Sequence, residues 1–222
     1  MIDENILGFP QSCVVNKNVA KKAFYSRGEQ RTKLKDWLTH SVEAITWLYK
    51  LSAQTVNVAD GAEVHEIDVF LMECKVCAEI DLRQLAAIDL LLPRHTMFVV
   101  RQGESVSLLI HHKEIYTDAH GEKKWRCGDA ELLRDVDLSE TRLMLEGNDM
   151  DAVYVGLLRL VSGLDIGREV SYAEAAEKRA RLKRLNAQAA SLKKSLRSER
   201  QYNKQVEINK MLKEVKRQIS EL

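Results

Sequence analysis

The sequence is poor in the residues that mark several large protein classes. Of its 222 residues only 2 are proline and 10 are glycine, which excludes a proline-rich linker protein and argues against a β-solenoid or a glycine-rich nucleotide binder. No apolar run approaches the roughly 18–20 residues that a membrane-spanning helix needs. The segment MIDENILGFP is acidic, and its apolar part is too short for a secretory signal. We therefore expect a cytoplasmic protein without membrane contact.

Patterns of nucleophiles and metal ligands are also scarce. The cysteines are Cys13, Cys74, Cys77 and Cys127. In an intracellular chain of this length they do not form a disulfide framework, and we expect them to be reduced. Cys74-x-x-Cys77 lacks the second close pair of ligands that a zinc site requires. The six histidines form no ligand pattern, and there is neither a serine-nucleophile elbow nor a phosphate-binding glycine loop. The sequence thus predicts no metal and no cofactor.

The net charge of +1 hides a strong division along the chain. Residues 171–222 hold 14 Lys/Arg and 6 Glu, whereas the rest of the chain holds 20 Lys/Arg and 27 Asp/Glu. The C-terminal segment contains no Pro, Gly, Trp, Phe or Cys and is rich in helix-forming residues. Such asymmetry is typical of an interaction segment. It predicts a mixed α/β domain at 1–165 and a basic helical segment at 171–222.

Two apolar seams with heptad spacing run through the basic segment. The seam positions are Leu182, Leu185, Ala189, Leu192 and Leu196, and then Ile208, Leu212, Val215, Ile219 and Leu222. The seams are out of phase, because continuing the first by sevens reaches positions 199, 203, 206 and 210, which hold Glu, Asn, Val and Lys. We therefore predict an antiparallel helical hairpin or coiled coil with its bend near 200–204. One long helix with a stutter is the alternative, and the pattern leaves open whether the pairing is within or between chains.

The remaining chain mixes helix and strand patterns. We expect a helix over 29–51, a short extended piece at 55–58 and a strand over 64–77. A helix from Asp81 to Leu92, before Pro93, then leads to a strand at 97–100, and a turn at 102–104 joins this strand to another at 106–112. After a turn at 120–122 before 124–127, we expect irregular structure over 128–150 and a helix from Asp149 or Asp151 to about Gly163. A strand–helix–strand unit favours a parallel crossover, and the later turns add antiparallel strands. The predicted class is α+β, with a predominantly antiparallel sheet that contains one parallel crossover.

Glu73 and Lys75 form a Glu-x-Lys triplet on the strand predicted over 64–77. Nucleases of the restriction-enzyme type place this triplet on a core strand, where it holds a divalent metal and polarises a water molecule. Asp60 or Asp68 would supply the further carboxylate, and Mg²⁺ would be the metal. Alternating charge on the solvent face of a strand produces the same triplet, and a three-residue motif specifies little. We therefore keep the nuclease as an alternative hypothesis.

Five cations gather toward the predicted bend: Lys193, Lys194, Arg197, Arg200 and Lys204. Three interpretations of these cations are open. They form a solvated helical face, they dock on an acidic protein surface or pair with another chain, or they contact the phosphates of a nucleic acid.

Two stretches, ITWLYKLSAQTVNV (45–58) and SERQYNKQVEINKMLKEVK (198–216), resemble a bacterial and archaeal family known as domain of unknown function 4391. The segments between them follow a similar order: an EIDVF strand, AAIDLLLPRHTMFVV and a SLLIHHKE strand. The resemblance extends from about residue 8 to the end of the chain. The family often has an Ile-Pro-x-Pro pattern before its second core strand, whereas this chain has Leu92-Pro93-Arg94-His95.

Genes of that family commonly sit beside helicase, DNA methyltransferase and restriction-type genes in phage-defence islands. The resemblance thus implies an accessory role and supplies no catalytic residues. Our leading hypothesis is a non-enzymatic interaction subunit of a helicase- or methyltransferase-containing defence complex, whose basic arm docks that protein partner or DNA. The alternatives are the divalent-metal nuclease and a stand-alone DNA-binding module.

Overall fold

The computed structural model describes residues 7–26, 31–76, 78–137, 145–163 and 172–222. Internal contacts divide the chain into two compact units, Met1–Glu169 and Val170–Leu222. Among the described residues, no helix is both long enough and apolar enough to span a bilayer.

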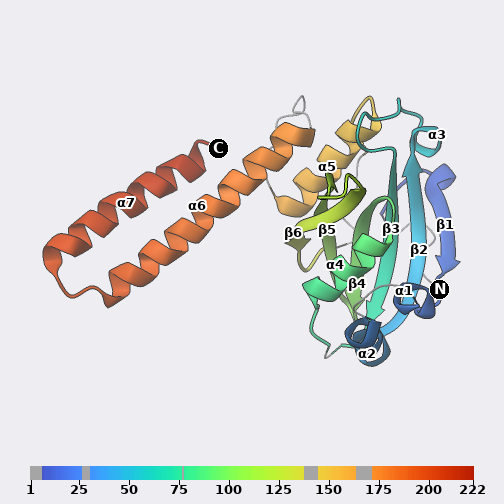
Figure 1. Ribbon diagram of the computed structural model, residues 1–222, viewed down its shortest axis with the longest axis horizontal. Coiled ribbons are helices and arrows are strands. Elements are labelled where there is room, and N and C mark those ends of the chain that lie inside the picture. Colours follow the sequence, from blue (N-terminus) through green and yellow to red (C-terminus); the bar gives the residue numbers. More distant parts are fainter. Residues whose placement is uncertain (1–6, 27–30, 77, 138–144, 164–171) are drawn as a thin grey trace. The chain divides into compact units, whose positions relative to one another are not determined.

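The first unit is built on one six-stranded sheet whose strands lie side by side in sequence order (Figure 1). The strands are β1 (Val14–Asn18), β2 (Val42–Ser52), β3 (Glu66–Cys74), β4 (His95–Gln102), β5 (Ser105–Thr117) and β6 (Lys123–Leu133). Neighbouring strands are antiparallel except β3 and β4, which are parallel. The predicted α+β class with a single parallel crossover is confirmed.

The helix α4 (Leu82–Leu91) makes this crossover. Asp81 caps its N-terminus, where the carboxylate accepts hydrogen bonds from the backbone N–H groups of Arg83 at 2.9 Å and Gln84 at 3.3 Å. The helix ends before Leu92, which is extended because Pro93 follows. The predicted helix over 81–92 is thus confirmed.

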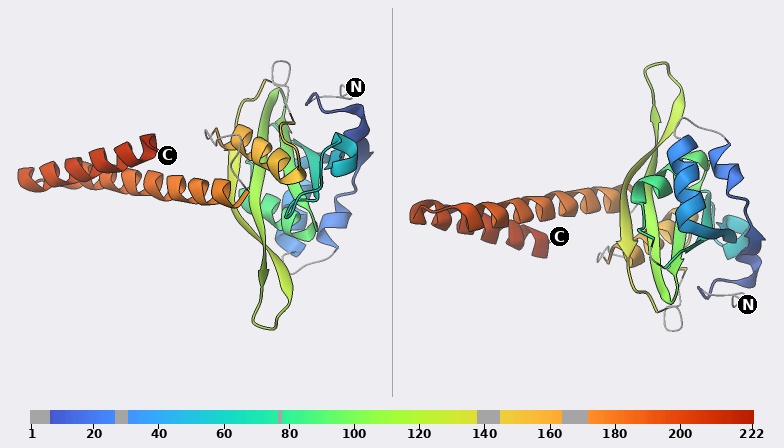
Figure 2. Two further views of the ribbon diagram at one scale, coloured as in Figure 1. Left: turned by 90° about the horizontal axis from the view of Figure 1, so that it is seen from above. Right: turned by 90° about the horizontal axis from the view of Figure 1, so that it is seen from below.

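Helices cover both faces of the sheet (Figure 2). On one face, α2 (Arg31–Ser41) and α4 pack onto an apolar core. Its side chains include Leu34, Leu38, Leu85 and Ile88 from the helices and Phe70, Met72, Phe98 and Val100 from the central strands. The opposite face is covered by α5 (Met150–Ser162). Of the two predicted starting residues, Asp149 and Asp151, it is Asp149 that caps the helix, where it accepts a hydrogen bond from the Ala152 N–H at 2.8 Å. The short elements are η1 (Gln11–Cys13), α1 (Lys22–Tyr25) and α3 (Ala53–Val56).

The predicted helix over 29–51 is wrong in its second half. The helix α2 ends at Ser41, and β2 follows directly and pairs with β3 along its length. Two irregularities of register interrupt that ladder, and each bulge shifts the inside–outside alternation by one residue. As a result β2 is buried at three-residue steps that imitate a helix, at Val42, Ile45, Leu48 and Leu51.

Three smaller predictions also need correction. The piece expected to be extended at 55–58 begins inside helix α3, because Ser52 and Thr55 form a capping box that starts a helical turn. The region expected to be irregular from residue 128 instead continues β6 to Leu133, paired with β5. The strand expected over 64–77 ends at Cys74, and Cys77 lies outside the described residues.

The second unit consists of α6 (Tyr172–Ser198) and α7 (Tyr202–Ser220), which pack together as an antiparallel hairpin (Figure 1). The two predicted seams face each other: Leu185, Ala189, Leu212 and Val215 are buried, with Leu192, Ile219 and Leu222 packed against them. The bend occupies residues 199–201. The alternative of one long helix with a stutter is therefore wrong, and the seams pair within one chain.

Candidate functional site

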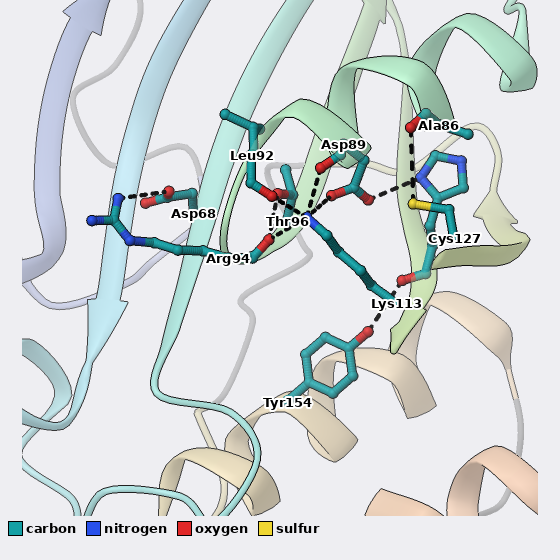
Figure 3. A network of polar contacts seen from close by, with 10 residues as sticks. Asp68, Ala86, Asp89, Leu92, Arg94, Thr96, Lys113, Cys127 and Tyr154 are labelled. Atoms are coloured by element: carbon teal, nitrogen blue, oxygen red, sulfur yellow. Dashed lines mark hydrogen bonds and ion pairs between the residues drawn. The ribbon is translucent and has the colours of Figure 1, made fainter. Parts of the chain in front are cut away.

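A connected network of polar side chains lies at the C-terminal end of α4 (Figure 3). The Lys113 ammonium group donates hydrogen bonds to Asp89 Oδ1 at 3.1 Å and to the carbonyl oxygens of Asp89 at 2.6 Å, Arg94 at 2.7 Å and Leu92. His111 Nδ1 lies 3.2 Å from the other Asp89 oxygen. The carbonyls at the end of a helix carry partial negative charge, so a cation placed there is favourable.

Burial assigns this network a structural role. Asp89, Lys113 and His111 are 0%, 1% and 2% exposed, so a substrate has no access to them. The amine of Lys113 is surrounded by four acceptors and its charge is balanced by Asp89. A buried pair of this kind persists when its hydrogen-bonding capacity is satisfied. The network therefore fastens the end of α4 to β5.

A second charged group lies beside the network at the start of β3. The Arg94 guanidinium lies 2.9 Å from a Glu66 oxygen and 3.5 Å from an Asp68 oxygen, and Lys50 lies 2.9 Å from the other Glu66 oxygen. Burial raises the pKa of Asp68 to about 6, and the Glu66 charge adds to the increase while Arg94 opposes it. Asp68 therefore titrates nearer neutrality than an ordinary aspartate.

The nuclease hypothesis places Asp68 and Glu73 at one site, but the two lie apart. Both are on β3, five positions from each other, which sets their side chains on opposite faces and separates them by roughly 16 Å along the strand. The Glu73 carboxylate lies 3.8 Å from the Arg101 guanidinium. Glu73 is thus placed beside a cation rather than beside a second carboxylate.

The other two nuclease candidates are also separate. Lys75 follows the end of β3, where its backbone N–H donates to the Ser41 carbonyl at 2.9 Å. Asp60 precedes β3, and its carboxylate lies 3.0 Å from His65 Nδ1. Among the described residues, no three His, Cys, Asp or Glu side chains form a group that could hold a metal ion.

In the hairpin, charge is sorted about the apolar seams. The residues that directly follow the seam positions are Lys183, Asn186, Ala190, Lys193 and Arg197 in α6, and Asn209, Lys213, Lys216 and Ser220 in α7. The residues that directly precede them are Arg181, Arg184, Gln188, Ser191 and Ser195, and then Glu207, Met211, Glu214, Gln218 and Glu221. The following positions hold only cations and small neutral residues. The preceding positions hold every carboxylate of 202–222.

The following positions of both helices lie on the same side of the hairpin. Two antiparallel helices that pack through equivalent seams are related by a two-fold rotation about an axis normal to the plane that contains both helices. This rotation maps the flank of following positions of one helix onto the same flank of the other, so both flanks lie on one side of that plane. Exposed cations from α6 and α7 therefore share one side. We call this side the basic face. Its members are Lys183, Lys193, Arg197, Lys213 and Lys216 at following positions, together with Lys194, which lines the same hollow as Lys193 and Arg197.

The structure places the five predicted cations in three different parts of the hairpin. Lys193, Lys194 and Arg197 line one open hollow of about 460 Å³ together with Ala190 and Ser198. Arg200 lies in the bend and Lys204 in the first turn of α7. Sequence reasoning missed Lys213 and Lys216, although the signal was present: both directly follow positions of the second seam.

Carboxylates near the hairpin tip and on α7 are engaged away from the basic face. Arg217 lies 2.7 Å from a Glu214 oxygen and also pairs with Glu221. The hydrogen bonds from Arg217 lower the pKa of Glu214 to about 2. Glu199 accepts hydrogen bonds from the backbone N–H groups of Arg200 at 2.8 Å and Gln201 at 2.9 Å. These carboxylates are therefore engaged with Arg217 and with the bend rather than with Lys193, Lys194, Arg197, Lys213 or Lys216.

Comparison with known proteins adds a family. The family model described as Domain of unknown function (DUF4391) matches residues 7–219. The chain belongs to the DUF4391 family. The match spans the sheet, its helices and both helices of the hairpin. No curated protein and no solved structure matches the chain.

Proposed function

We propose that this protein is a non-enzymatic accessory subunit of a helicase- or methyltransferase-containing phage-defence complex, and that the basic face of its α6–α7 hairpin binds the DNA on which that complex acts. The observation that carries the proposal is the distribution of charge on the hairpin. The six exposed cations of the basic face lie on one side, and no Asp or Glu side chain lies among them. The chain belongs to the DUF4391 family, and the gene neighbourhood that we expect for this family suggests the complex.

The composition of the basic face favours phosphates over a protein surface. Five of its six cations are lysines, and lysine is depleted in protein–protein interfaces, where arginine and aromatic anchors dominate. Lys183 and Arg197 are separated by 14 positions, which is about 21 Å along a helix. A row of one charge sign over this length complements a nucleic-acid strand, which carries one negative charge per about 3.4 Å of axis.

The first unit supports a non-enzymatic role. Its connected polar network is closed to substrate, and the side chains of the nuclease hypothesis are dispersed. Binding, which needs only exposed charge, is the activity that the described surface serves best.

Charge reversal with a matched control tests DNA binding. In the full chain, Lys193→Glu/Lys194→Glu/Arg197→Glu reverses three charges of the basic face. Arg181→Glu/Arg184→Glu/Lys204→Glu reverses three charges on the preceding flank, where Lys204 lies seven positions before Met211, and gives the same net charge. We expect the first variant to weaken binding to duplex and single-stranded DNA at least about tenfold at low salt, and the second to have a much smaller effect. Equal losses in both variants would contradict a face-specific site.

Two further measurements complete the test. The logarithm of the wild-type affinity should fall linearly with the logarithm of salt concentration, by roughly 0.9 per phosphate contact. Affinity purification of the full chain from its native host should recover a helicase or DNA methyltransferase. Recovery of neither enzyme would remove the accessory part of the proposal, and absence of salt-sensitive DNA binding would remove the rest.

A further inference from the structure

The side chain of Tyr202 is 76% exposed, at the first position of α7. The tyrosines of the first unit that face its core behave differently: Tyr49 and Tyr154 are each 1% exposed. Packing does not explain this exposed ring, because Tyr202 is not among the side chains that form the apolar core of the hairpin.

Tyr202 belongs to the basic face. The residues Tyr202, Val206, Asn209, Lys213 and Lys216 follow one another at steps of four, three, four and three. This spacing keeps them on one flank of α7. Val206 on the same flank is also exposed, so the flank is apolar toward the tip and basic farther along.

The hollow on α6 lies at the same end of the hairpin as this tyrosine. Counting outward from the bend at 199–201, Ser198 is level with Tyr202 and Lys194 is level with Val206 along the hairpin. Ser198, Arg197, Lys194 and Lys193 line the hollow, which belongs to α6 alone. An exposed aromatic ring and three cations therefore occupy the tip of the hairpin, and the ring shares its flank with Lys193 and Arg197.

Hydrogen bonds order the backbone of the bend that precedes this ring. Glu199 Oε1 accepts hydrogen bonds from two successive backbone N–H groups of the bend, at 2.8 and 2.9 Å. The Gln205 side chain donates to the Glu199 carbonyl at 2.7 Å. These bonds lower the pKa of Glu199, so the one carboxylate at the tip is committed to the backbone. A ring on a preorganised turn loses less entropy when it binds.

We infer that the tip of the basic face is a single-stranded DNA site in which Tyr202 stacks on an unpaired base while Lys193, Lys194 and Arg197 contact the flanking phosphates. This inference rests on the proposed function and adds its substrate class. Aromatic rings beside a basic groove are the general means of binding single strands, because every base offers a π-face. In a duplex the bases are paired and stacked on one another, so only the cations retain partners.

The test compares one sequence as a single strand and as a duplex. Fluorescence anisotropy with an oligonucleotide of about 15 nucleotides, within the footprint of small single-strand modules, gives the affinity of the full chain in each form. We expect Tyr202→Ala to weaken single-strand binding roughly 5- to 150-fold, the range that loss of one stacked base implies. Duplex binding should change less than about twofold, and Tyr202→Phe should bind like the wild type.

Met211 supplies the control, since it is an exposed apolar residue of α7 at a preceding position. Met211→Ala should leave both affinities unchanged. An unchanged single-strand affinity for Tyr202→Ala, or equal losses for both DNA forms, would overturn the inference. If Tyr202→Ala has no effect while reversal of the three cations abolishes binding to both forms, DNA binding stands and the single-strand site falls. If the wild type binds neither form, both fall.

Discussion

Lys113 shows how a charge can be buried at the centre of a small sheet domain. Three of its four acceptors are backbone carbonyls at and beyond the C-terminal end of α4, and the fourth is the Asp89 carboxylate. Its ammonium group also lies 4.9 Å from the centre of the Trp125 ring, a distance at which a cation is attracted to an aromatic face. The spacing of apolar and polar residues in the sequence does not predict this contact, because the partners of Lys113 come from segments about 20 residues away in the chain.

Replacement of Lys113 should be strongly destabilising. Lys113→Met keeps the length of the side chain but leaves the buried Asp89 carboxylate uncompensated, so we expect the free energy of unfolding to fall by about 3–5 kcal/mol. Urea denaturation measures this change. The double variant Lys113→Met/Asp89→Asn should recover part of the loss, because the amide carries no charge to bury. A single variant within about 0.5 kcal/mol of the wild type would contradict the structural role.

Asp68 should make a visible contribution to the pH dependence of stability. Its pKa is about 6 in the folded protein against an ordinary value of 3.8, so the folded state binds this proton more tightly. The Asp68 contribution to the free energy of unfolding is therefore greatest below pH 4 and is lost as the pH rises through 6. His95 acts oppositely, because burial lowers its pKa from 6.5 to about 4, and its contribution is lost as the pH falls from 6.5 to 4.

The variant Asp68→Asn separates these two opposing effects. Denaturant unfolding of both proteins between pH 7 and 4 gives the stability of the variant minus that of the wild type. This difference should become steadily more negative as the pH falls, because only the wild type gains from protonation of residue 68. His95 is common to both proteins and cancels. A difference that is flat, or that rises toward low pH, would refute the assignment.

At the scale of elements, β2 and α6–α7 show when the spacing of apolar residues predicts the correct secondary structure. In β2 a three-residue spacing arises from two bulges in a strand buried on both faces, so a local pattern predicts the wrong element. In the hairpin the pattern extends over two long segments, and a break in phase marks the bend. Length and repetition remove the ambiguity that a ten-residue pattern leaves.

The hairpin should respond to a core substitution independently of the sheet unit. Leu212 is buried against α6, and Leu212→Ala should destabilise the hairpin by about 2 kcal/mol, the lower end of the range for leucine, because its site lies near solvent. Hydrogen exchange should show faster exchange in α6 and α7 with little change in β3 and β4. Met211→Ala, its exposed neighbour, should leave exchange unaltered. Equal acceleration in the sheet would indicate that the two units unfold together.

At the scale of the whole molecule, charge divides the chain into two parts. The acidic unit 1–169 builds a sheet in which Lys113 and Asp89 are buried as an ion pair, while the basic unit 170–222 carries exposed charge on one side of a hairpin. An acidic surface repels phosphate, so the proposed nucleic-acid site belongs to the hairpin rather than to the acidic unit.

The sequence by itself predicted the fold class, the crossover helix with its Asp81 cap, a helix beginning at Asp149 or Asp151, and, in preference to one long helix, the hairpin. Each of these depends on interactions between residues close in sequence, or on a repeat long enough to fix a phase. The cations at 193, 194 and 197 were also identified from sequence, since a cluster of charge needs no partner to be recognised.

Only the tertiary structure decided the rest. It turned residues 42–52 into a central strand, because pairing with β3 and burial on both faces outweigh local helical spacing. It joined Lys113 to Asp89 and separated Glu73 from Asp68, because both results depend on how strands pair and which face each residue takes. It also brought Tyr202, Lys213 and Lys216 to the side of Lys193, because antiparallel packing of the two seams within one chain sets which flanks of the helices coincide.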